Sequence, residues 1–276
     1  MFEKVSMSHP DKLSDRIAGA IVDLAYTKQE NPKIAGEILL GHGKCAITIE
    51  SSAGFTKKEI REIVHRIAGK VKVDLLVVPQ DKHLADNQKN EIRCGDNGIF
   101  KGVPLTKEEK ELSCLARTIY KKFPYDGKYI LTKDTLIICQ SNAKSSQLFA
   151  MCKDVRKNIV INPIGEWTGG SNVDSGCCNR KLGSDMAQSV TGGGLHFKDI
   201  SKADVSVNIY CFMEAQRTGK VIEAYCAIGD TNVTIYTYDK TRRRKKIVPY
   251  KKIVDFAKTY IDSIGGFEKF AEWGLY

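Results

Sequence analysis

The segment SHPDKLSDRIAGAIVDL, residues 8–24, decides where the fold begins. Pro10 suits the first position of a helix, because a first turn leaves its N–H groups unpaired and proline has none. Four apolar residues then recur at helical spacing, namely Leu13, Ile17, Ile21 and Leu24. The segment therefore predicts an amphipathic helix whose apolar stripe faces the core.

His9 and Asp11 fall at the N-terminus of this predicted helix. Exposed N–H groups at such a position favour phosphate, and a carboxylate beside a phosphate can hold magnesium. Alternatively, His9 or Ser8 only caps the helix, and Asp11 only interacts with the helix dipole. The residues of this segment alone leave both interpretations open.

A hairpin, a helix and a strand follow outward along the chain. Apolar runs at 34–40 and 44–49, split by a Gly-His-Gly turn, predict a hairpin. Residues 56–59, TKKE, form a capping box that starts a helix. Residues 71–78 predict a buried strand.

The same order of elements recurs twice. The second copy comprises a helix at 106–122, strands at 129–131 and 135–139, a helix from Ser145 and a strand at 159–161. The third comprises a helix at 201–216, a hairpin at 220–238 and a helix at 250–264. Three copies of one αββα pattern predict an α/β (α+β) protein whose three small sheets, each backed by helices, have a pseudo-threefold arrangement. We expect subdomains at 1–102, 103–164 and 165–276.

Composition narrows the class of protein. Of 276 residues, 42% are hydrophobic and 28% charged, which is ordinary for a globular protein. No run of 18 apolar residues and no secretory signal is evident, so we expect a cytoplasmic protein without a membrane partner. Nine cysteines, an odd number, predict reduced and largely buried thiols. The net charge of +10 permits either nucleic-acid binding or a highly anionic small substrate.

Residues 162–204 concentrate the polar chemistry of the chain. Glycine turns at 169–170 and 192–194 let the backbone approach a ligand closely. Four cations and two carboxylates follow these turns, namely Asp174, Arg180, Lys181, Lys198, Lys202 and Asp204. Such a set suits a polyphosphate with magnesium, which needs both charge neutralisation and oriented N–H groups. The alternative is two solvated loops with ordinary surface charge.

Two further segments are polar. Residues 79–98 form a long segment with few apolar residues, for which we favour a lid over a site. The basic run at 241–246, TRRRKK, is interpreted as a solvated turn, with an anion or nucleic-acid contact as the alternative.

Four ordered motifs carry a resemblance to a family. They are HPDKLSDRI, GDNG, NPIGEWTGGSNVDSGCCNRK and GGGLHFKDISKAD. In this order they resemble the S-adenosylmethionine synthetases (methionine adenosyltransferases), which carry GHPDK, GDQG, a GG-x-x-x-D-x-G…RK segment and GGGAFSGKD-x-x-K-x-D. The resemblance implies three αβ subdomains around a pseudo-threefold axis. It also implies a homodimer, or a dimer of dimers, with active sites between subunits.

The reaction implied by the resemblance starts from ATP and L-methionine. The methionine sulfur attacks C5′ of ATP, and the released tripolyphosphate is hydrolysed to pyrophosphate and phosphate. A thioether has no proton to lose, so catalysis must come from positioning and from stabilising the leaving group. Tripolyphosphate leaves with about four negative charges, for which clustered Lys/Arg and two Mg²⁺ are the expected partners, with K⁺ as a further ion.

Site residues also follow from the resemblance. Polyphosphate would be held by His9, Lys128 with its neighbour Asp126, Arg180, Lys181 and Lys198. Magnesium would be bound by Asp11 and Asp204, and potassium by Glu37. Trp167 would stack on adenine, and Asp174 would hold the ribose or substrate. Asp96 and Lys202 would lie near methionine.

The chain departs from the family pattern at several positions. Glu166 stands where the family has an Arg before the adenine-stacking aromatic. The glutamate that recognises the methionine amine has no direct equivalent, and Glu50 could serve only with a register shift of two residues, which preserves the face of a strand. Gln80 and Asp81 are the nearest match to the family's Q-S-P-D lid pattern. The chain is also short, chiefly in its middle unit.

Two other functions compete with S-adenosylmethionine synthesis. A relative on the same scaffold could use another sulfur nucleophile or act only as a tripolyphosphatase. A basic nucleic-acid-binding protein would use the +10 charge, but the sequence lacks aromatic interleaving and a recognisable binding motif. We therefore expect no nucleic-acid partner.

Overall fold

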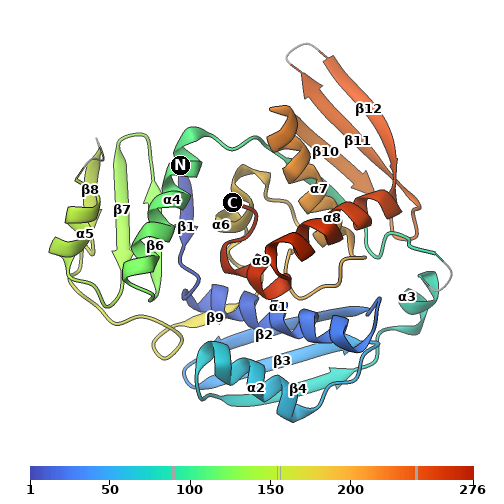
Figure 1. Ribbon diagram of the computed structural model, residues 1–276, viewed down its shortest axis with the longest axis horizontal. Helices are drawn as coiled ribbons and strands as arrows, with labels where there is room; N and C mark the ends of the chain where they lie inside the picture. Colours follow the sequence, from blue (N-terminus) through green and yellow to red (C-terminus); the bar gives the residue numbers. More distant parts are fainter. Residues whose placement is uncertain (89–90, 154, 156, 240–241) are drawn as a thin grey trace.

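Three four-stranded sheets surround a central group of helices (Figure 1). The computed structural model describes residues 1–88, 91–153, 155, 157–239 and 242–276. The predicted α/β class with three helix-backed sheets is confirmed. The nine cysteines carry free thiols, and most of them are buried, as expected. In the described ranges, no helix combines the length and the apolar character that crossing a membrane requires.

The first sheet has the strand order β4-β3-β2-β9. Its strands are β2 (Ile34–Gly41), β3 (Lys44–Ser51), β4 (Lys72–Val78) and β9 (Ser175–Cys177). Helices α1 (Pro10–Lys28) and α2 (Lys57–Ala68) cover one face, and α2 begins with the predicted capping box at Thr56. The prediction of a buried strand at 71–78 is wrong. Among the described residues, β4 pairs only with β3 and no helix covers its outer face, where Leu76 is 55% exposed.

The second sheet has the order β1-β6-β7-β8. Its strands are β1 (Phe2–Val5), β6 (Gly127–Leu131), β7 (Thr135–Gln140) and β8 (Asn158–Ile161). Helices α4 (Lys107–Lys122) and α5 (Ser145–Met151) accompany it, and α4 begins with the predicted capping box at Thr106. Leu112, Tyr129 and Ile138 belong to a core cluster separate from the larger one beneath the other two sheets.

The third sheet has the order β12-β11-β10-β5. Its strands are β5 (Gly98–Gly102), β10 (Val221–Cys226), β11 (Asn232–Asp239) and β12 (Arg242–Pro249), and helices α7 (Ala203–Thr218) and α8 (Tyr250–Ile264) complete the unit. The prediction of a turn at 241–246 is wrong from Arg242 onward, because this run forms β12; Thr241 lies outside the described residues. The run pairs fully with β11, and the Arg243 guanidinium lies 3.5 Å from the Tyr236 ring centroid. Charged side chains suit such an edge strand because they discourage pairing with other chains.

Each sheet takes one strand from a distant part of the chain. β1 joins the second sheet, β5 the third and β9 the first. The predicted subdomain boundaries, at 1–102, 103–164 and 165–276, remain a prediction. The strand exchange means that the three units are tied together by sheet hydrogen bonds.

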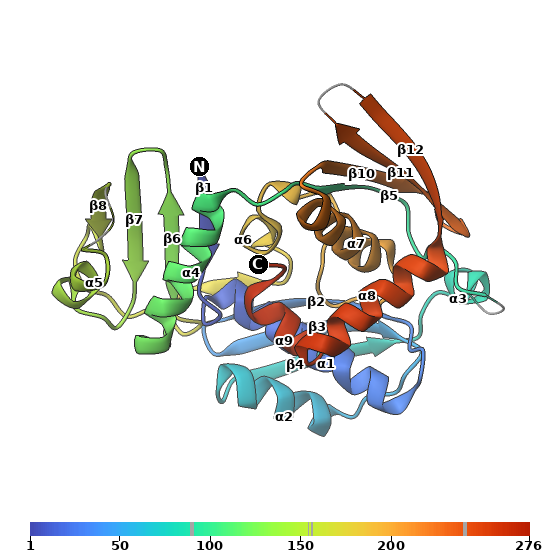
Figure 2. The same ribbon diagram turned by 45° about the horizontal axis from the view of Figure 1, so that its top comes forward.

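The central helices are closely packed. Helix α9 (Phe267–Trp273) lies against α1, and a Cβ on Gly19 would stand 2.5 Å from the Phe267 carbonyl oxygen. Asp23 on α1 accepts hydrogen bonds from the Phe267 and Glu268 amides and so caps α9. Helix α6 (Leu182–Met186), the 3₁₀ turn η1 (Ala187–Ser189) and the peripheral α3 (Lys82–Asn87) complete the described helices (Figure 2).

Candidate active site

The N-terminus of α1 forms the centre of the candidate site. His9 is the N-cap, and its Nδ1 accepts a hydrogen bond of 3.2 Å from the Asp11 amide. Burial lowers the pKa of His9 to about 4, with Asp11 opposing the shift and Lys181 and Lys128 adding to it. The imidazole is therefore neutral at neutral pH. Because Nδ1 accepts, its proton lies on Nε2, which can donate to an anion.

Asp11 connects α1 to residues far along the chain. Its Oδ1 accepts from the Cys177 amide at 2.8 Å and its Oδ2 from the Lys181 ammonium at 2.7 Å, while the Arg180 Nε lies 3.6 Å from Oδ1. Burial alone would raise the pKa of Asp11, but the Lys181 and Cys177 hydrogen bonds lower it below its usual value. β9 approaches so closely that a Cβ on Gly176 would stand 2.1 Å from the Pro10 carbonyl carbon, so only glycine fits.

Lys128 and Asp126 approach the same end of α1 from the second sheet. Lys128 lies opposite Val5, and its ammonium is 2.7 Å from Glu3 Oε2. Asp126 is buried and accepts a 3.1 Å hydrogen bond from the Gly170 amide. Burial raises the pKa of Asp126 to about 6, against that hydrogen bond.

Trp167 lies at the edge of a cavity of about 450 Å³. Its Nε1 donates to Asn162 Oδ1 at 3.3 Å, which orients the indole. Glu166 lines the same cavity, and so does Lys144, a cation that sequence reasoning did not select. A flat aromatic beside a cavity of this size is suited to stacking on a base.

A second charged cluster lies at the N-terminal end of α7. The Lys198 ammonium donates to Asp204 Oδ2, and a Cβ on Gly193 would stand 2.0 Å from Asp204 Oδ1. Lys202 is buried beside Gly95, the residue before Asp96. The structure thus brings Lys198, Asp204, Lys202 and the segment of Asp96 to one region.

The two clusters lie along the same edge of β2. Cys177 pairs with Leu39, and Lys198 forms a β-bridge with Ala35. Four residues of strand separate these positions, or roughly 13 Å at about 3.3 Å per residue. The candidate polyphosphate-binding cations of two distant segments are therefore aligned along one strand.

Glu37 and Glu50 share the outer face of the first sheet. Glu37 lies opposite Thr48 and Glu50 opposite Ala35, so the two glutamates are diagonal neighbours with a separation of roughly 7–8 Å. Both side chains are exposed. Glu37 also accepts a hydrogen bond of 3.0 Å from the Cys178 thiol. With the two-residue register shift proposed for it, Glu50 lies on the same face as Glu37. It also lies opposite Ala35, the residue that forms the β-bridge with Lys198.

Asp174 is exposed and caps its own turn through the Ser175 amide. It acts electrostatically on both His9 and Asp126. Asp174 therefore belongs with the cluster at the N-terminus of α1. Lys202 and the segment of Asp96 lie at the second cluster, and Glu37 and Glu50 lie on the outer face of the first sheet.

The predicted lid segment is partly helical. Within its described residues, α3 is capped by Asp81, whose Oδ1 accepts from the Leu84 amide. Gln88 accepts a hydrogen bond of 2.7 Å from Ser201 Oγ, and the Cys94 amide donates to the Asp230 carbonyl. Residues 89 and 90 lie outside the described ranges. Closure of this segment over the site remains a prediction.

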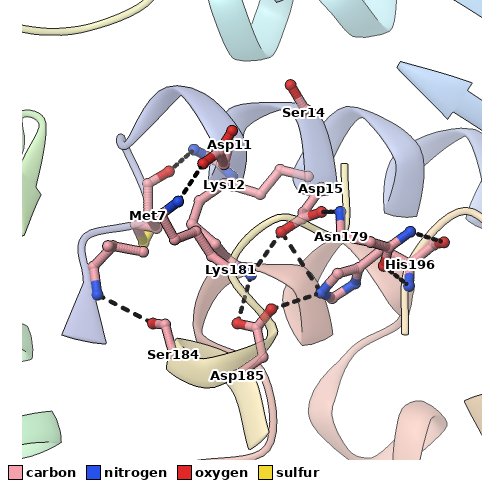
Figure 3. A network of polar contacts seen from close by, with 12 residues as sticks. Met7, Asp11, Lys12, Ser14, Asp15, Asn179, Lys181, Ser184, Asp185 and His196 are labelled. Carbon is pink, nitrogen blue, oxygen red and sulfur yellow. Dashed lines mark hydrogen bonds and ion pairs between the residues drawn. The ribbon is translucent and has the colours of Figure 1, made fainter. Parts of the chain in front are cut away.

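Sequence reasoning missed a buried network beneath the site (Figure 3). It comprises Lys12, Asp15, Asn179, Asp185 and His196. One signal was available: Asp15 follows Asp11 by four residues, so both carboxylates lie on the same side of α1. Asn179 and His196 carried no such local signal, because their partners are remote in the sequence.

Several carboxylates of the candidate site supply donor atoms that suit metal ions. Asp11 and Asp204 supply carboxylate oxygens, the ligands that Mg²⁺ prefers, and each now accepts from a lysine ammonium in a position that a cation could take. Glu37 supplies an exposed carboxylate that suits K⁺. Asp15, Asp185 and His196 also converge, but the Lys12 ammonium lies between the two carboxylates and excludes a metal there.

Comparisons with known proteins show what the chain is similar to. The family model "S-adenosylmethionine synthetase, N-terminal domain" matches residues 1–79. The S-adenosylmethionine synthase of a Sulfurovum species is 27% identical over 267 residues, with 74% of this chain and 69% of the relative covered. That of Mycoplasma capricolum subsp. capricolum is 24% identical over 271 residues, with 76% and 70% covered. The structure of an unusual S-adenosylmethionine synthetase from Campylobacter jejuni aligns with a TM-score of 0.75 at 19% identity, covering 100% of this chain and 94% of that one. The structural likeness shows a shared fold.

Proposed function

We propose that this chain is a divergent, short member of the S-adenosylmethionine synthetase family and makes S-adenosylmethionine from ATP and L-methionine, because its first 79 residues match the family's N-terminal domain and its relatives are S-adenosylmethionine synthases. The methionine sulfur forms a bond to C5′ of ATP as the C5′–oxygen bond breaks. The bonding electrons leave with the triphosphate chain, and the sulfur becomes a sulfonium. No proton is removed, so the protein needs cations and geometry rather than a general base.

One observation carries the proposal. The Asp11 carboxylate and the Arg180 and Lys181 cations converge on the N-terminus of α1, next to the neutral His9. Helix N–H groups, two cations and a donor imidazole meet there, which suits a highly charged leaving group. Lys128 and Lys198 extend the cation set on either side. A solvated loop would not bury Asp11 to 1% exposure.

The remaining substrate contacts are assigned by position. Adenine would lie against Trp167 in its cavity, with Asp174 near the ribose. Methionine would lie toward Lys202, Asp96 and Glu50, where the Glu50 carboxylate can pair with the methionine ammonium. Asp126 would help to hold the phosphate end through the loop that starts at Gly170.

Metal ions would act on the leaving group. Asp11 and Asp204 would each hold a Mg²⁺, and Glu37 a K⁺. When bound, Mg²⁺ supplies charge neutralisation to the phosphate oxygens, and the lysines that now pair with these carboxylates become free for phosphate. The same cations would retain the tripolyphosphate during its hydrolysis to pyrophosphate and phosphate.

The expected assembly is a homodimer or a dimer of dimers. Leu39 and Leu76 are each 55% exposed on the outer face of the first sheet, which no described helix covers. This face also carries Glu37 and Glu50. A second copy that covers it would bury these leucines and close the methionine end of the site.

The direct test is to incubate the protein with ATP, Mg²⁺ and K⁺, with and without methionine. The expected result is S-adenosylmethionine together with pyrophosphate and phosphate, only when methionine is present. Phosphate release without any S-adenosylmethionine would reject the proposal.

The second candidate is a tripolyphosphatase, or an enzyme for another sulfur nucleophile, on the same site. The observation in its favour is that Glu50, the candidate for the methionine amine, requires a shifted register. Tripolyphosphate hydrolysis that is indifferent to methionine, or product formation with a different thioether, would favour it.

A further inference from the structure

The side chain of Asn179 joins the two loops that carry the candidate phosphate cations. Its Nδ2 donates to the His196 carbonyl at 3.1 Å, and its Oδ1 accepts from the His196 amide at 2.8 Å. Asn179 directly precedes Arg180 and Lys181. His196 lies two residues before Lys198. We call this pair of hydrogen bonds the clamp.

The clamp is part of a closed ring of buried and partly buried contacts (Figure 3). From Asn179, the backbone amide donates to Asp15 Oδ1 at 2.8 Å, and Asp15 Oδ2 lies 3.1 Å from the Lys12 ammonium. Lys12 donates to Asp185 Oδ1 at 2.7 Å. Asp185 Oδ2 lies 3.1 Å from Nε2 of His196, whose backbone returns to Asn179. The ring thus holds α1, the 177–181 loop and the 194–198 loop together.

The charges in the ring support one another. Burial would lower the pKa of Lys12, but Asp185 and Asp15 raise it above its usual value. Burial would raise the pKa of Asp185, but Lys12 and His196 lower it. The Lys12 ammonium and the Asp185 carboxylate, at 1% and 0% exposure, resist displacement, because separating them would leave a charge buried without its partner.

The backbone around the clamp is shaped to admit it. Asn179 has a left-handed φ of 61°, which asparagine tolerates better than most residues. A Cβ on Gly194 would stand 2.5 Å from Asn179 Cγ, so the second glycine turn leaves room for this amide. Lys12, Asp15, Asp185 and His196 are buried and Asn179 is partly buried, and none of them lines the cavity of Trp167, so they act through the loops they hold.

We propose that Asn179, held by the buried ring, is a positioning residue that fixes the Arg180–Lys181 loop relative to Lys198 and Asp204. One polyphosphate can then contact both cation clusters at once. The inference rests on the proposed function in so far as the ligand is a polyphosphate chain. It does not depend on the identity of the sulfur nucleophile.

The first test is Asn179→Gly, which removes the amide and keeps a residue that accepts a left-handed φ. Binding of tripolyphosphate in the presence of Mg²⁺ is measured by calorimetry, and folding by circular dichroism and thermal unfolding. We expect tenfold or greater loss of tripolyphosphate affinity and a fall in kcat. The matched control is His42→Gly, since His42 has a φ of 50° on the exposed turn between β2 and β3. It should leave both quantities unchanged.

A second measurement separates positioning from folding. Arg180→Gln and Lys198→Gln are combined in a double-mutant cycle on tripolyphosphate affinity. In the wild-type background the losses of tripolyphosphate affinity caused by the two substitutions should be coupled, because one ligand spans both cations. In the Asn179→Gly background the two losses of affinity should be independent, so that the double variant shows their product. A purely structural role would lower stability and leave the coupling in place, which would overturn the proposal.

Gly194→Ala provides an independent variant, because its Cβ would displace the Asn179 amide without changing any ring residue. It should reproduce the loss of coupling, and it carries the test if Asn179→Gly does not fold. Unchanged affinity and coupling in Gly194→Ala would also overturn the proposal. If the wild type binds tripolyphosphate but makes no S-adenosylmethionine, the proposed function fails, whereas the positioning role is still decided by the cycle.

Discussion

Lys181 donates a 2.7 Å hydrogen bond to Asp11 Oδ2 across 170 residues of sequence. The carboxylate is almost completely buried, and its other oxygen accepts from the Cys177 amide. The pair therefore has two roles. It anchors β9 and the following loop to the first turn of α1. It also holds the Lys181 ammonium at the position where a polyphosphate and its metal ion would bind.

Replacing Lys181 with Met should affect both stability and catalysis. Removing one partner of a buried ion pair costs about 3 kcal/mol, and loss of a cation at the leaving group should reduce turnover by about 10²-fold. Thermal unfolding and S-adenosylmethionine formation measure the two effects. The double variant Asp11→Asn with Lys181→Met should recover stability, because no unpaired carboxylate remains, but should not recover turnover. Near-normal turnover in Lys181→Met would mean that the cluster does not contact the leaving group.

Trp167→Ala should weaken ATP binding. Stacking of a base on an aromatic side chain contributes about 1–3 kcal/mol, so a roughly 5- to 150-fold rise in the KM for ATP is expected, and Trp167→Phe should restore most of the affinity. The other tryptophan provides a matched control. Trp273 contacts Tyr120 and Arg117, so Trp273→Phe should leave ATP affinity unchanged.

Trp273→Phe also leaves Trp167 as the only tryptophan. Its fluorescence should change on addition of ATP and reach a plateau at saturation. A constant signal despite measured ATP binding would remove Trp167 from the nucleotide site.

Glu50→Gln should raise the KM for methionine without changing the KM for ATP. A hydrogen bond to a charged group contributes about 1.5–3 kcal/mol, which corresponds to a roughly 10- to 150-fold rise. Glu62→Gln, on the exposed side of α2, is the charge-matched control. If both KM values stayed at the wild-type level, a different group would have to recognise the methionine amine.

Asp126→Asn should change how stability depends on pH. Burial raises the folded-state pKa of Asp126 to about 6, so protonation stabilises the folded protein. This contribution is complete below the unfolded pKa near 4 and is lost as the pH rises through about 6. Asparagine mimics the protonated form and can still accept from the Gly170 amide. The variant should therefore gain up to about 3 kcal/mol relative to wild type at pH 7.5, and this gain should shrink toward zero near pH 4.

The measurement is a series of thermal unfolding curves between pH 4 and pH 8. Asp134→Asn, on an exposed turn between β6 and β7, serves as control. A gain that did not vary with pH would show that the effect of Asp126→Asn comes from packing rather than from ionisation.

Most elements could be predicted from the sequence because their signals are local. The apolar spacing of α1, the capping boxes at Thr56 and Thr106, and the two runs of β2 and β3 each involve residues within a few positions of one another. The motifs with His9, Arg180 and Lys198 identified the cation clusters for the same reason. Elements and motifs formed by residues that are close in the sequence can be predicted from the sequence.

Two predictions failed because the environment of a strand depends on the surrounding sheet and not only on its own residues. The basic composition of the run from Arg242 predicts a turn, yet pairing with β11 and the stacking of Arg243 on Tyr236 make it a strand. The apolar run at 71–78 predicts a buried strand, yet it forms an edge strand of the first sheet. Whether a strand is buried depends on which other elements cover the faces of its sheet, and the spacing of apolar residues in the sequence does not indicate this.

By itself, the sequence determined the three αββα units and the residue types available for a polyphosphate. Tertiary structure decided which of those residues meet. The pairing of Asp11 with Lys181, the clamp between Asn179 and His196, and the alignment of both clusters along β2 depend on contacts across more than a hundred residues or on packing between separate loops. Such contacts arise because burial makes unpaired charges and amides costly, so the folded chain brings together partners that local spacing cannot indicate.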